Sequence, residues 1–155
     1  RPVRFVMYYK IYQLPLLNIV SRNARAIPIA SGFENKALME QAFDQVDEAL
    51  RQGDVVCIFP EGRLTADGSI GTFKSGVERI IERTPVPVLS MCLYGLWGSA
   101  FSRYRGFILW RIINGFRSRV DLSVSAPQQP EDVTARSLQS RVTDLCAASA
   151  RARGY

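Results

Sequence analysis

The chain has 155 residues, of which 47% are hydrophobic and 22% charged, and its net charge is +6. A chain of this length forms one ordinary domain that buries roughly 70% of its unfolded surface. Because no apolar run approaches the roughly 20 residues that span a bilayer, and no basic-then-apolar leader opens the chain, we expect a soluble or peripheral protein.

The three cysteines are Cys57, Cys92 and Cys146, an odd number spread far apart in the sequence. Two of them sit inside apolar runs, where a thiol packs as a small hydrophobic group. This usage predicts a reducing, cytoplasmic setting without disulfides, zinc or any other metal.

The first half of the chain predicts two short buried strands and a long helix. The strands are expected at residues 4–9 and 26–30. Over residues 36–52 the apolar side chains recur at helical spacing. Asn35 can cap the start of this helix, and Gly53 suits its left-handed exit.

Residues 54–59 form a continuous run of β-formers, which predicts a central strand buried on both faces. Pro60 ends it, because proline has no N–H for the next ladder bond. A short helix is expected over 75–83 and another buried strand over 86–94. Strands that alternate with helices in this way predict an α/β fold with a single-layered, largely parallel sheet flanked by helices.

The last two predicted elements are a strand over 117–126 and a helix over 133–148. The strand alternates apolar with polar residues, which predicts an edge position with one wetter face. Its inward side chains would be Val120, Leu122 and Val124, and its wetter ones Arg119, Asp121 and Ser123.

A polar motif follows the strand predicted at 54–59. It reads Phe59-Pro60-Glu61-Gly62-Arg63, and Phe73-Lys74-Ser75-Gly76 follows it. In open α/β sheets ligands bind beyond the carboxyl ends of the strands. There Gly62 permits a close turn, Arg63 offers a planar fork for phosphate oxygens, and Lys74 adds a point charge. The plainer interpretation is a turn with a surface salt bridge, worth at most about 1 kcal/mol.

These blocks, followed by Val86-Pro87-Val88-Leu89, resemble the glycerolipid acyltransferase family in order and spacing. Two more segments, Ala24-Arg25-Ala26-Ile27-Pro28-Ile29-Ala30 and Gly95-Leu96-Trp97-Gly98-Ser99, resemble the members that act on lysophosphatidylethanolamine or are fused to a transporter-like membrane part. Ser31 and Ser90 depart from this pattern, since many members carry arginine and proline there, and this leaves the acceptor head group open.

The family's general base is a histidine in a His-x-x-x-x-Asp block, but the chain contains no histidine. We therefore expect residues 1–155 to be an acyltransferase domain that lacks its N-terminal catalytic block. No residue of this chain is assigned a catalytic role, and the fragment is predicted to be inactive.

The resemblance implies direct acyl transfer in phospholipid biosynthesis. An acyl thioester, either acyl-CoA or acyl-acyl carrier protein, would donate the acyl group to the free hydroxyl of a lysophospholipid, without another cofactor. The acceptor would be bound by Phe59, Pro60, Glu61, Gly62, Arg63 and Lys74. The expected location is the cytoplasmic face of a membrane, the bacterial inner membrane by analogy. The alternative is a non-catalytic lipid- or acyl-carrier-binding module, and whether the chain forms a homodimer stays open.

Between residues 96 and 119, aromatic residues interleave with arginines. This composition suits contact with an anionic membrane surface, because aromatic rings favour head-group depth and cations meet anionic lipid. The residues predicted to make this contact are Trp97, Phe101, Arg103, Arg105, Trp110 and Arg111. Core packing is the competing interpretation, and nucleic-acid binding is disfavoured because no RNP-like, helix-turn-helix or zinc pattern accompanies the segment.

Overall fold

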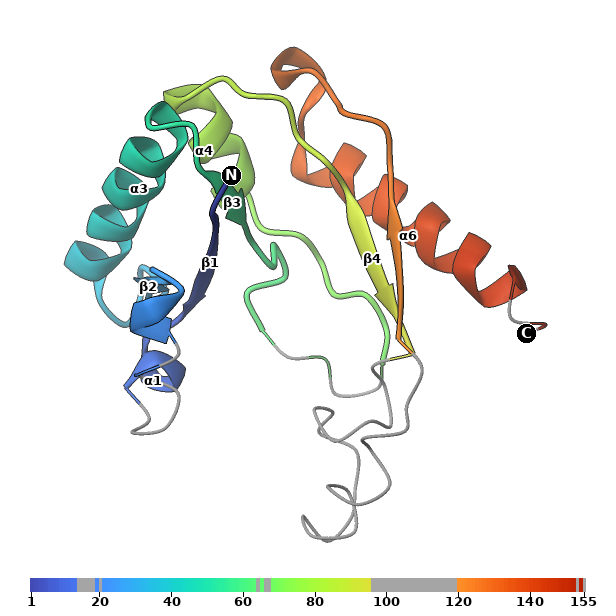
Figure 1. The fold of residues 1–155 in the computed structure, drawn as a ribbon, viewed down its shortest axis with the longest axis horizontal. Coiled ribbons are helices and arrows are strands. Elements are labelled where there is room, and N and C mark those ends of the chain that lie inside the picture. The colour runs from blue at the N-terminus through green and yellow to red at the C-terminus, as the bar shows by residue number, and fades with distance from the viewer. Residues whose placement is uncertain are drawn as a thin grey trace, which may run out of the picture. The chain divides into compact units, whose positions relative to one another are not determined.

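The computed structural model describes residues 1–13, 19, 21–63, 65, 68–95, 120–152 and 154 (Figure 1). The chain divides into two compact units. The first comprises Arg1–Gly62 and Gly76–Val86, and the second comprises Arg63–Ser75 and Pro87–Tyr155.

The first unit contains a three-stranded parallel sheet in the order β2-β1-β3. Its strands are β1 (Val3–Tyr8), β2 (Ile27–Ile29) and β3 (Val55–Cys57), and its helices are α1 (Tyr9–Tyr12), α3 (Lys36–Arg51) and α4 (Gly76–Arg83). Both long connections between parallel strands contain a helix, which is the usual way to join them. The predicted α/β class, with a parallel sheet flanked by helices, is confirmed.

Helix α3 forms where the sequence predicts it, and both of its ends are capped. The Asn35 side chain accepts a 2.9 Å hydrogen bond from the Leu38 N–H. Gly53, at φ +82°, follows the helix, and its N–H donates to the Leu50 carbonyl while that of Asp54 donates to Ala49. This pair of bonds is a Schellman motif, which satisfies carbonyls that the helix itself leaves open.

The core of the first unit lies between α3 and one face of the sheet. Ile27 from β2 meets Ala42 and Val46 from α3, and all three are buried. The partly buried side chains of Val56 on β3 and Ile80 on α4 pack against this cluster. Val6 of β1 packs there as well, so all three strands and the helices α3 and α4 contribute to one apolar layer.

Strand β3 differs from its prediction in position and burial. It flanks β1 and forms one edge of the sheet in the part of the chain that the structure describes, so β1 is the central strand. Val55 is 42% exposed, because successive side chains of a strand point to opposite faces and only that of Val56 meets the core. The prediction of a central strand buried on both faces is wrong.

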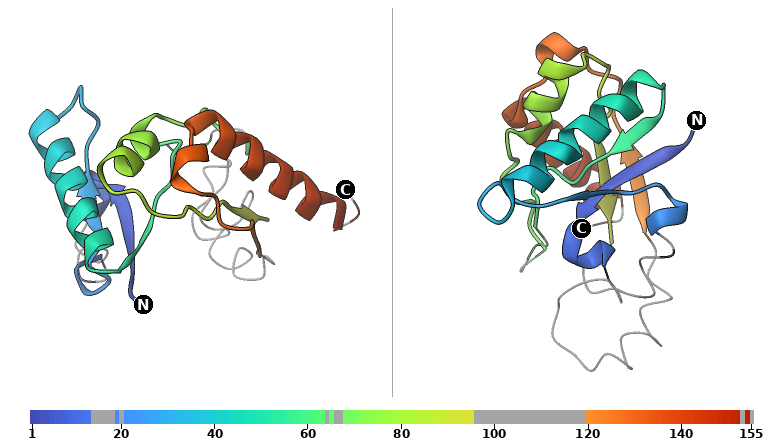
Figure 2. Two further views of the ribbon diagram at one scale, coloured as in Figure 1. Left: turned by 90° about the horizontal axis from the view of Figure 1, so that it is seen from above. Right: turned by 90° about the vertical axis from the view of Figure 1, so that its left-hand side faces the viewer.

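The second unit pairs β4 (Met91–Tyr94) with β5 (Asp121–Val124) in antiparallel register, with Cys92 opposite Ser123. The short 3-10 helix η1 (Pro130–Asp132) leads to α6 (Ala135–Ala152), which runs alongside the pair (Figure 2). These strands form a separate antiparallel ladder, so the predicted parallel arrangement holds for the first unit and not for β4 and β5.

The burial of β4 and β5 is the reverse of what their apolar residues predict. Leu122 is 58% exposed and Leu93 is also exposed, whereas Cys92 is almost fully buried. The reason is that α6 packs on the face that carries Cys92 and Ser123, and the Ser123 hydroxyl lies 2.8 Å from that of Ser149 on α6. The predicted inward face of β5 and the predicted full burial of the strand at 86–94 are therefore wrong.

Candidate functional site

The segment after β3 makes a tight turn. The Gly62 N–H donates a 3.0 Å hydrogen bond to the Phe59 carbonyl, which closes a β-turn with Pro60 in its second position. Gly62 has φ +61°, in the left-handed region that glycine enters without steric cost. The structure thus brings four of the predicted site residues, Phe59 to Gly62, into one turn. Phe59 is exposed in this turn, and Glu61 is half-buried.

This turn lies at the carboxyl edge of the parallel sheet. Cys57 pairs with Phe5 in β1, so the residues that follow β3 run toward the end of β1 at Tyr8. Tyr8 in turn pairs with Ile29, the last residue of β2. All three strands therefore end at the same edge, which is where ligands of open α/β sheets bind.

A second polar group at this edge was not predicted from the sequence. We call it the edge cluster: Tyr8, Lys10, Ser31 and Glu34. The Glu34 carboxylate accepts hydrogen bonds from the Tyr8 hydroxyl at 2.7 Å, from the Lys10 ammonium at 3.2 Å and from the Ser31 hydroxyl at 3.2 Å. Tyr8 is the last residue of β1 and Lys10 follows it, while Ser31 and Glu34 follow β2. The ends of the two strands meet only when the strands are paired in register, so the sequence positions of these residues are the signal for the cluster.

The edge cluster keeps its charges at neutral pH. Hydrogen bonds from Tyr8 and then from Lys10 lower the pKa of Glu34, and the Glu34 carboxylate raises the pKa of Tyr8. The Tyr8 hydroxyl and the Glu34 carboxylate raise the pKa of Lys10. The Lys10 ammonium also lies 5.5 Å from the centre of the Tyr8 ring. The cluster is therefore an ion pair supported by a neutral phenol.

The remaining predicted site residues, Arg63 and Lys74, belong to the second unit, and both are exposed. The backbone next to Lys74 is held against α6. The ring of Phe73 is buried, and the backbone N–H of Phe73 donates a 3.1 Å hydrogen bond to the Gln139 side chain on α6. The predicted membrane-contact residues Trp97, Phe101, Arg103, Arg105, Trp110 and Arg111 lie outside the described residues.

The cysteines correct the prediction of three reduced thiols. Cys92 on β4 and Cys146 on α6 form a disulfide, with their Cα atoms 5.6 Å apart. The sequence does not reveal this disulfide, because 54 residues separate the two cysteines and they approach only when α6 packs on β4. Cys57 is the free thiol, and burial raises its pKa, which disfavours the reactive thiolate.

Within the described residues, no three histidine, cysteine, aspartate or glutamate side chains are grouped as a metal site requires. None of the helices in the same part of the chain is long and apolar enough to cross a membrane.

Residues 1–94 match the family model described as Acyltransferase. The chain belongs to this acyltransferase family. The matched region contains the whole parallel sheet, the turn from Phe59 to Gly62, and Arg63 and Lys74. The resemblance to glycerolipid acyltransferases drawn from the sequence blocks is thereby confirmed.

Two curated acyltransferases are similar to parts of the chain. A probable 1-acyl-sn-glycerol-3-phosphate acyltransferase of Mycoplasma pneumoniae is 32% identical over 72 residues, which cover 46% of this chain and 27% of that protein. The chloroplastic 1-acyl-sn-glycerol-3-phosphate acyltransferase BAT2 of Brassica napus is 42% identical over 48 residues, or 31% of this chain and 14% of that protein.

The fold is also that of a solved acyltransferase. The crystal structure of the 1-acyl-sn-glycerophosphate acyltransferase PlsC from Thermotoga maritima superposes with a TM-score of 0.66 at 19% identity. The superposition covers 99% of this chain and 57% of the other. The chain thus spans little more than half the length of this acyltransferase, and its matches span smaller shares of the curated ones.

Proposed function

We propose that the chain is part of an acyltransferase domain that moves a fatty acyl group from a thioester to the free hydroxyl of a lysophospholipid. The observation that carries this proposal is the turn from Phe59 to Gly62 at the carboxyl end of a parallel strand, inside the region that matches the family. Both curated relatives are described as 1-acyl-sn-glycerol-3-phosphate acyltransferases, which supports a lysophospholipid as the acceptor.

In this proposal the residues of the chain bind and orient the acceptor. Arg63 and Lys74 are cations suited to its phosphate, and the Glu61 carboxylate accepts hydrogen bonds from glycerol hydroxyls. Phe59, Pro60 and Gly62 set the course of the turn that carries Glu61. Holding the two reactants in a fixed geometry accelerates transfer because their translational and rotational freedom has already been removed.

The reaction needs a general base that removes the proton from the acceptor hydroxyl. The oxygen then attacks the thioester carbonyl, the carbon–sulfur bond breaks, and the thiol product leaves with a proton. The 155 residues contain no histidine, so in this proposal a His-x-x-x-x-Asp block outside them supplies the base. General-base catalysis contributes roughly 10²- to 10⁴-fold, and the chain alone is therefore inactive or nearly so.

The donor in this proposal is acyl-CoA or acyl-acyl carrier protein, and no cofactor takes part. The domain works at a membrane surface, because its acceptor is a membrane lipid and its donor is water-soluble. The family resemblance favours the cytoplasmic face, whereas the disulfide between Cys92 and Cys146 is of a kind that is rare in reducing compartments. The subgroup suggested by residues 24–30 and 95–99 makes lysophosphatidylethanolamine one acceptor to test beside lysophosphatidate.

The test compares the chain alone with a protein in which a His-x-x-x-x-Asp block precedes it. Radiolabelled acyl-CoA and lysophosphatidate are the substrates, and the diacyl product is measured by thin-layer chromatography. The longer protein should form product and the 155-residue chain should not. Full turnover by the chain alone would disprove the role of the outside histidine, and no product from either would favour a non-catalytic lipid- or acyl-carrier-binding module.

The predicted acceptor site is tested in the same longer protein. Arg63→Gln and Lys74→Gln should each raise KM for lysophosphatidate, because each removes a charge assigned to its phosphate. Arg51→Gln is the matched control, since Arg51 is an exposed cation in the last turn of α3. An equal effect of all three variants would argue for general electrostatics in place of a binding site.

A further inference from the structure

An exposed aromatic ring marks the carboxyl edge of the sheet. Residues Ser31 to Glu34 form a β-turn, closed by a 3.0 Å hydrogen bond from the Glu34 N–H to the Ser31 carbonyl. Phe33 occupies the third position of this turn, and its relative exposure is 105%. A phenylalanine ring this exposed does not contribute the favourable free energy that burial of an apolar side chain gives to folding.

The turn that carries Phe33 is fixed to the rest of the first unit. The edge cluster ties the Glu34 carboxylate to Tyr8 and Lys10. On the other side, a Cβ atom added at Gly32 would lie 3.2 Å from the sulfur of Met39, so the turn packs closely against α3. The backbone that carries the Phe33 ring is therefore ordered before binding, so little backbone conformational entropy is lost when the ring contacts a partner.

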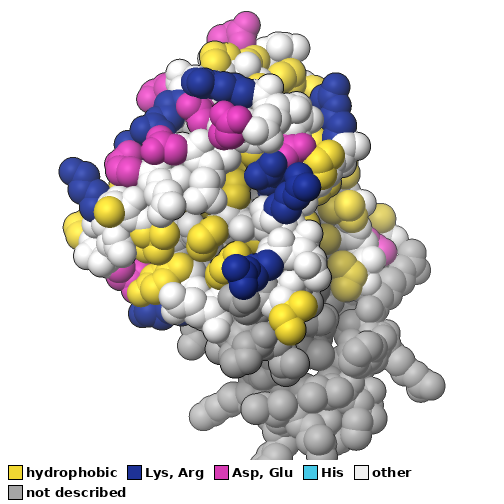
Figure 3. All heavy atoms as spheres, turned by 60° about the vertical axis from the view of Figure 1, so that its left-hand side comes forward, with side chains coloured by type: hydrophobic (Ala, Val, Ile, Leu, Met, Phe, Trp, Pro, Cys, Tyr) yellow, Lys and Arg dark blue, Asp and Glu magenta, His cyan; other side chains and the backbone are white. Residues whose placement is uncertain are grey.

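The carboxyl edge of the sheet carries other exposed apolar side chains, and a cationic side chain lies close to Phe33 in the sequence. Phe59, in the turn after β3, is 60% exposed at the same sheet edge, and Ile11 is exposed directly after Lys10. The side chains of Lys10 and Lys36 are both exposed. Lys10 is linked to the turn by its hydrogen bond to Glu34, and Lys36 is close to the turn in the sequence. On the face drawn in Figure 3, hydrophobic side chains form several separate groups, with lysine or arginine side chains among them.

From this arrangement we propose that the turn at Phe33 inserts into an anionic lipid bilayer and orients the carboxyl edge of the sheet toward it. Aromatic rings favour the depth of the lipid head groups. The Lys10 ammonium offsets the charge of Glu34, so the exposed Lys36 is the nearby cation that gains attraction from anionic lipids. The net charge of +6 fits the same partner. The inference rests on the proposed function, since a lipid acceptor must reach the Phe59–Gly62 turn at this edge.

A bilayer fits this surface better than a second protein does. Stable protein interfaces bury about 800 Å² on each partner around an apolar centre. The apolar groups at the turn are few, and Gly32, Glu34 and Lys36 lie around Phe33 in the sequence. Insertion into a bilayer needs only a small number of apolar side chains with adjacent cations.

The test is cosedimentation of the 155-residue chain with vesicles of phosphatidylcholine and phosphatidylglycerol. Phe33→Glu should weaken the partition coefficient at least about tenfold, as expected when a phenylalanine side chain no longer leaves water. Phe33→Trp should retain binding, because tryptophan keeps a large aromatic ring. Gln41→Glu is the matched control, since it adds the same charge at an exposed position of α3.

Three outcomes would overturn the proposal. The first is unchanged partition of Phe33→Glu, and the second is an equal loss for Phe33→Glu and Gln41→Glu. The third is a dimer in sedimentation equilibrium that Phe33→Glu dissociates without an effect on vesicle binding, since the partner would then be a second copy of the chain. A failure of the proposed acyl transfer would leave these vesicle measurements unaffected, so the two ideas fail separately.

Discussion

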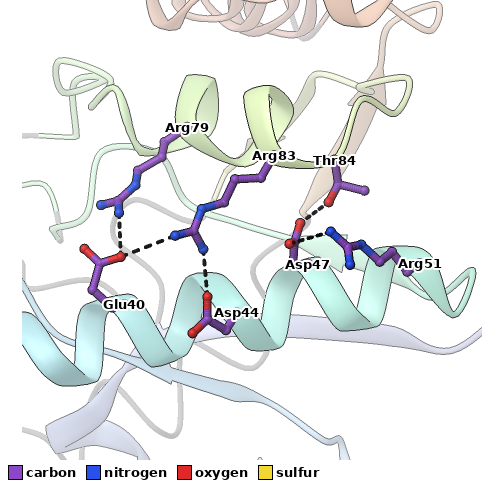
Figure 4. Close-up of polar contacts among 7 residues, drawn as sticks. All are labelled: Glu40, Asp44, Asp47, Arg51, Arg79, Arg83 and Thr84. Atoms are coloured by element: carbon purple, nitrogen blue, oxygen red, sulfur yellow. Dashed lines mark hydrogen bonds and ion pairs between the residues drawn. The ribbon is translucent and has the colours of Figure 1, made fainter.

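The guanidinium of Arg79 on α4 lies 4.5 Å from the centre of the Phe43 ring on α3. The same guanidinium forms a 2.5 Å ion pair with Glu40, one turn before Phe43 (Figure 4). Arg83, one turn further along α4, also lies over the ring, at 5.7 Å, and pairs with Glu40 and Asp44. A row of charged contacts therefore joins the two helices beside their apolar core.

Replacement of Arg79 by alanine should destabilise the protein more than replacement of a comparable surface arginine. The lost stacking alone is worth about 0.5–1 kcal/mol. Arg51→Ala is the control, since Arg51 makes an exposed pair with Asp47 on its own helix, a type worth about 0.3–0.5 kcal/mol. Urea denaturation followed by circular dichroism measures both. Equal losses would show that the ring contact adds nothing.

The pairing of Glu40 should appear in the pH dependence of stability. The hydrogen bond from Arg79 lowers the pKa of Glu40 from its ordinary value of 4.5. A lowered pKa in the folded state stabilises the protein above pH 4.5, and this contribution is lost as the pH falls through the folded-state pKa. Glu40→Gln should therefore lower the free energy of unfolding at pH 7 and make its decline below pH 4.5 shallower. Urea denaturation at several pH values measures the free energy of unfolding of both proteins. Parallel declines below pH 4.5 in the unsubstituted protein and in Glu40→Gln would contradict the prediction.

Local sequence signals predicted α3 and α4 well because each depends on residues close together in the chain. The apolar period that contains Ala42 and Val46, with Asn35 before it and Gly53 after it, determines a helix and its ends without reference to other elements. The turn at Gly62 was predicted for the same reason, from Pro60 and the glycine.

The errors concern contacts between distant residues. The alternation in β5 predicts a strand correctly but not which face is covered, and α6 selects the Ser123 face through the Ser149 hydroxyl and the disulfide at Cys92. The edge cluster was missed because Tyr8 and Glu34 meet only through the parallel register of β1 with β2. Register and helix docking are set by tertiary packing, which a local pattern does not encode.

The disulfide between Cys92 and Cys146 makes a direct prediction about thiols. The unreduced, denatured chain should react with one iodoacetamide, at Cys57, and the reduced chain with three. Cys146→Ser should lower the free energy of unfolding by about 2–4 kcal/mol, because the bond closes a long loop in the unfolded chain. Cys57→Ser, measured under the same oxidising conditions, is the control for loss of a sulfur. Three reactive thiols in the unreduced protein would refute the bond.

Substitutions at two glycines of the first unit can distinguish an effect of backbone strain on stability from an effect on activity. Gly53 after α3 and Gly62 after β3 both have positive φ, at +82° and +61°. Alanine in the left-handed region costs about 1 kcal/mol, so Gly53→Ala and Gly62→Ala should lower the free energy of unfolding by similar amounts. Only Gly62→Ala should also lower kcat/KM for acyl transfer in the longer, active protein, because the turn from Phe59 carries Glu61.

The comparison depends on measuring stability and turnover on the same two variants. If both lose activity equally, the cause is the lower stability that they share, and the turn has no special part in the reaction. If neither loses activity, the acceptor does not use the turn at the end of β3. A loss confined to Gly62→Ala, with matched unfolding curves, would assign that loss to the geometry of residues 59–62 and to the edge of the sheet at which they lie.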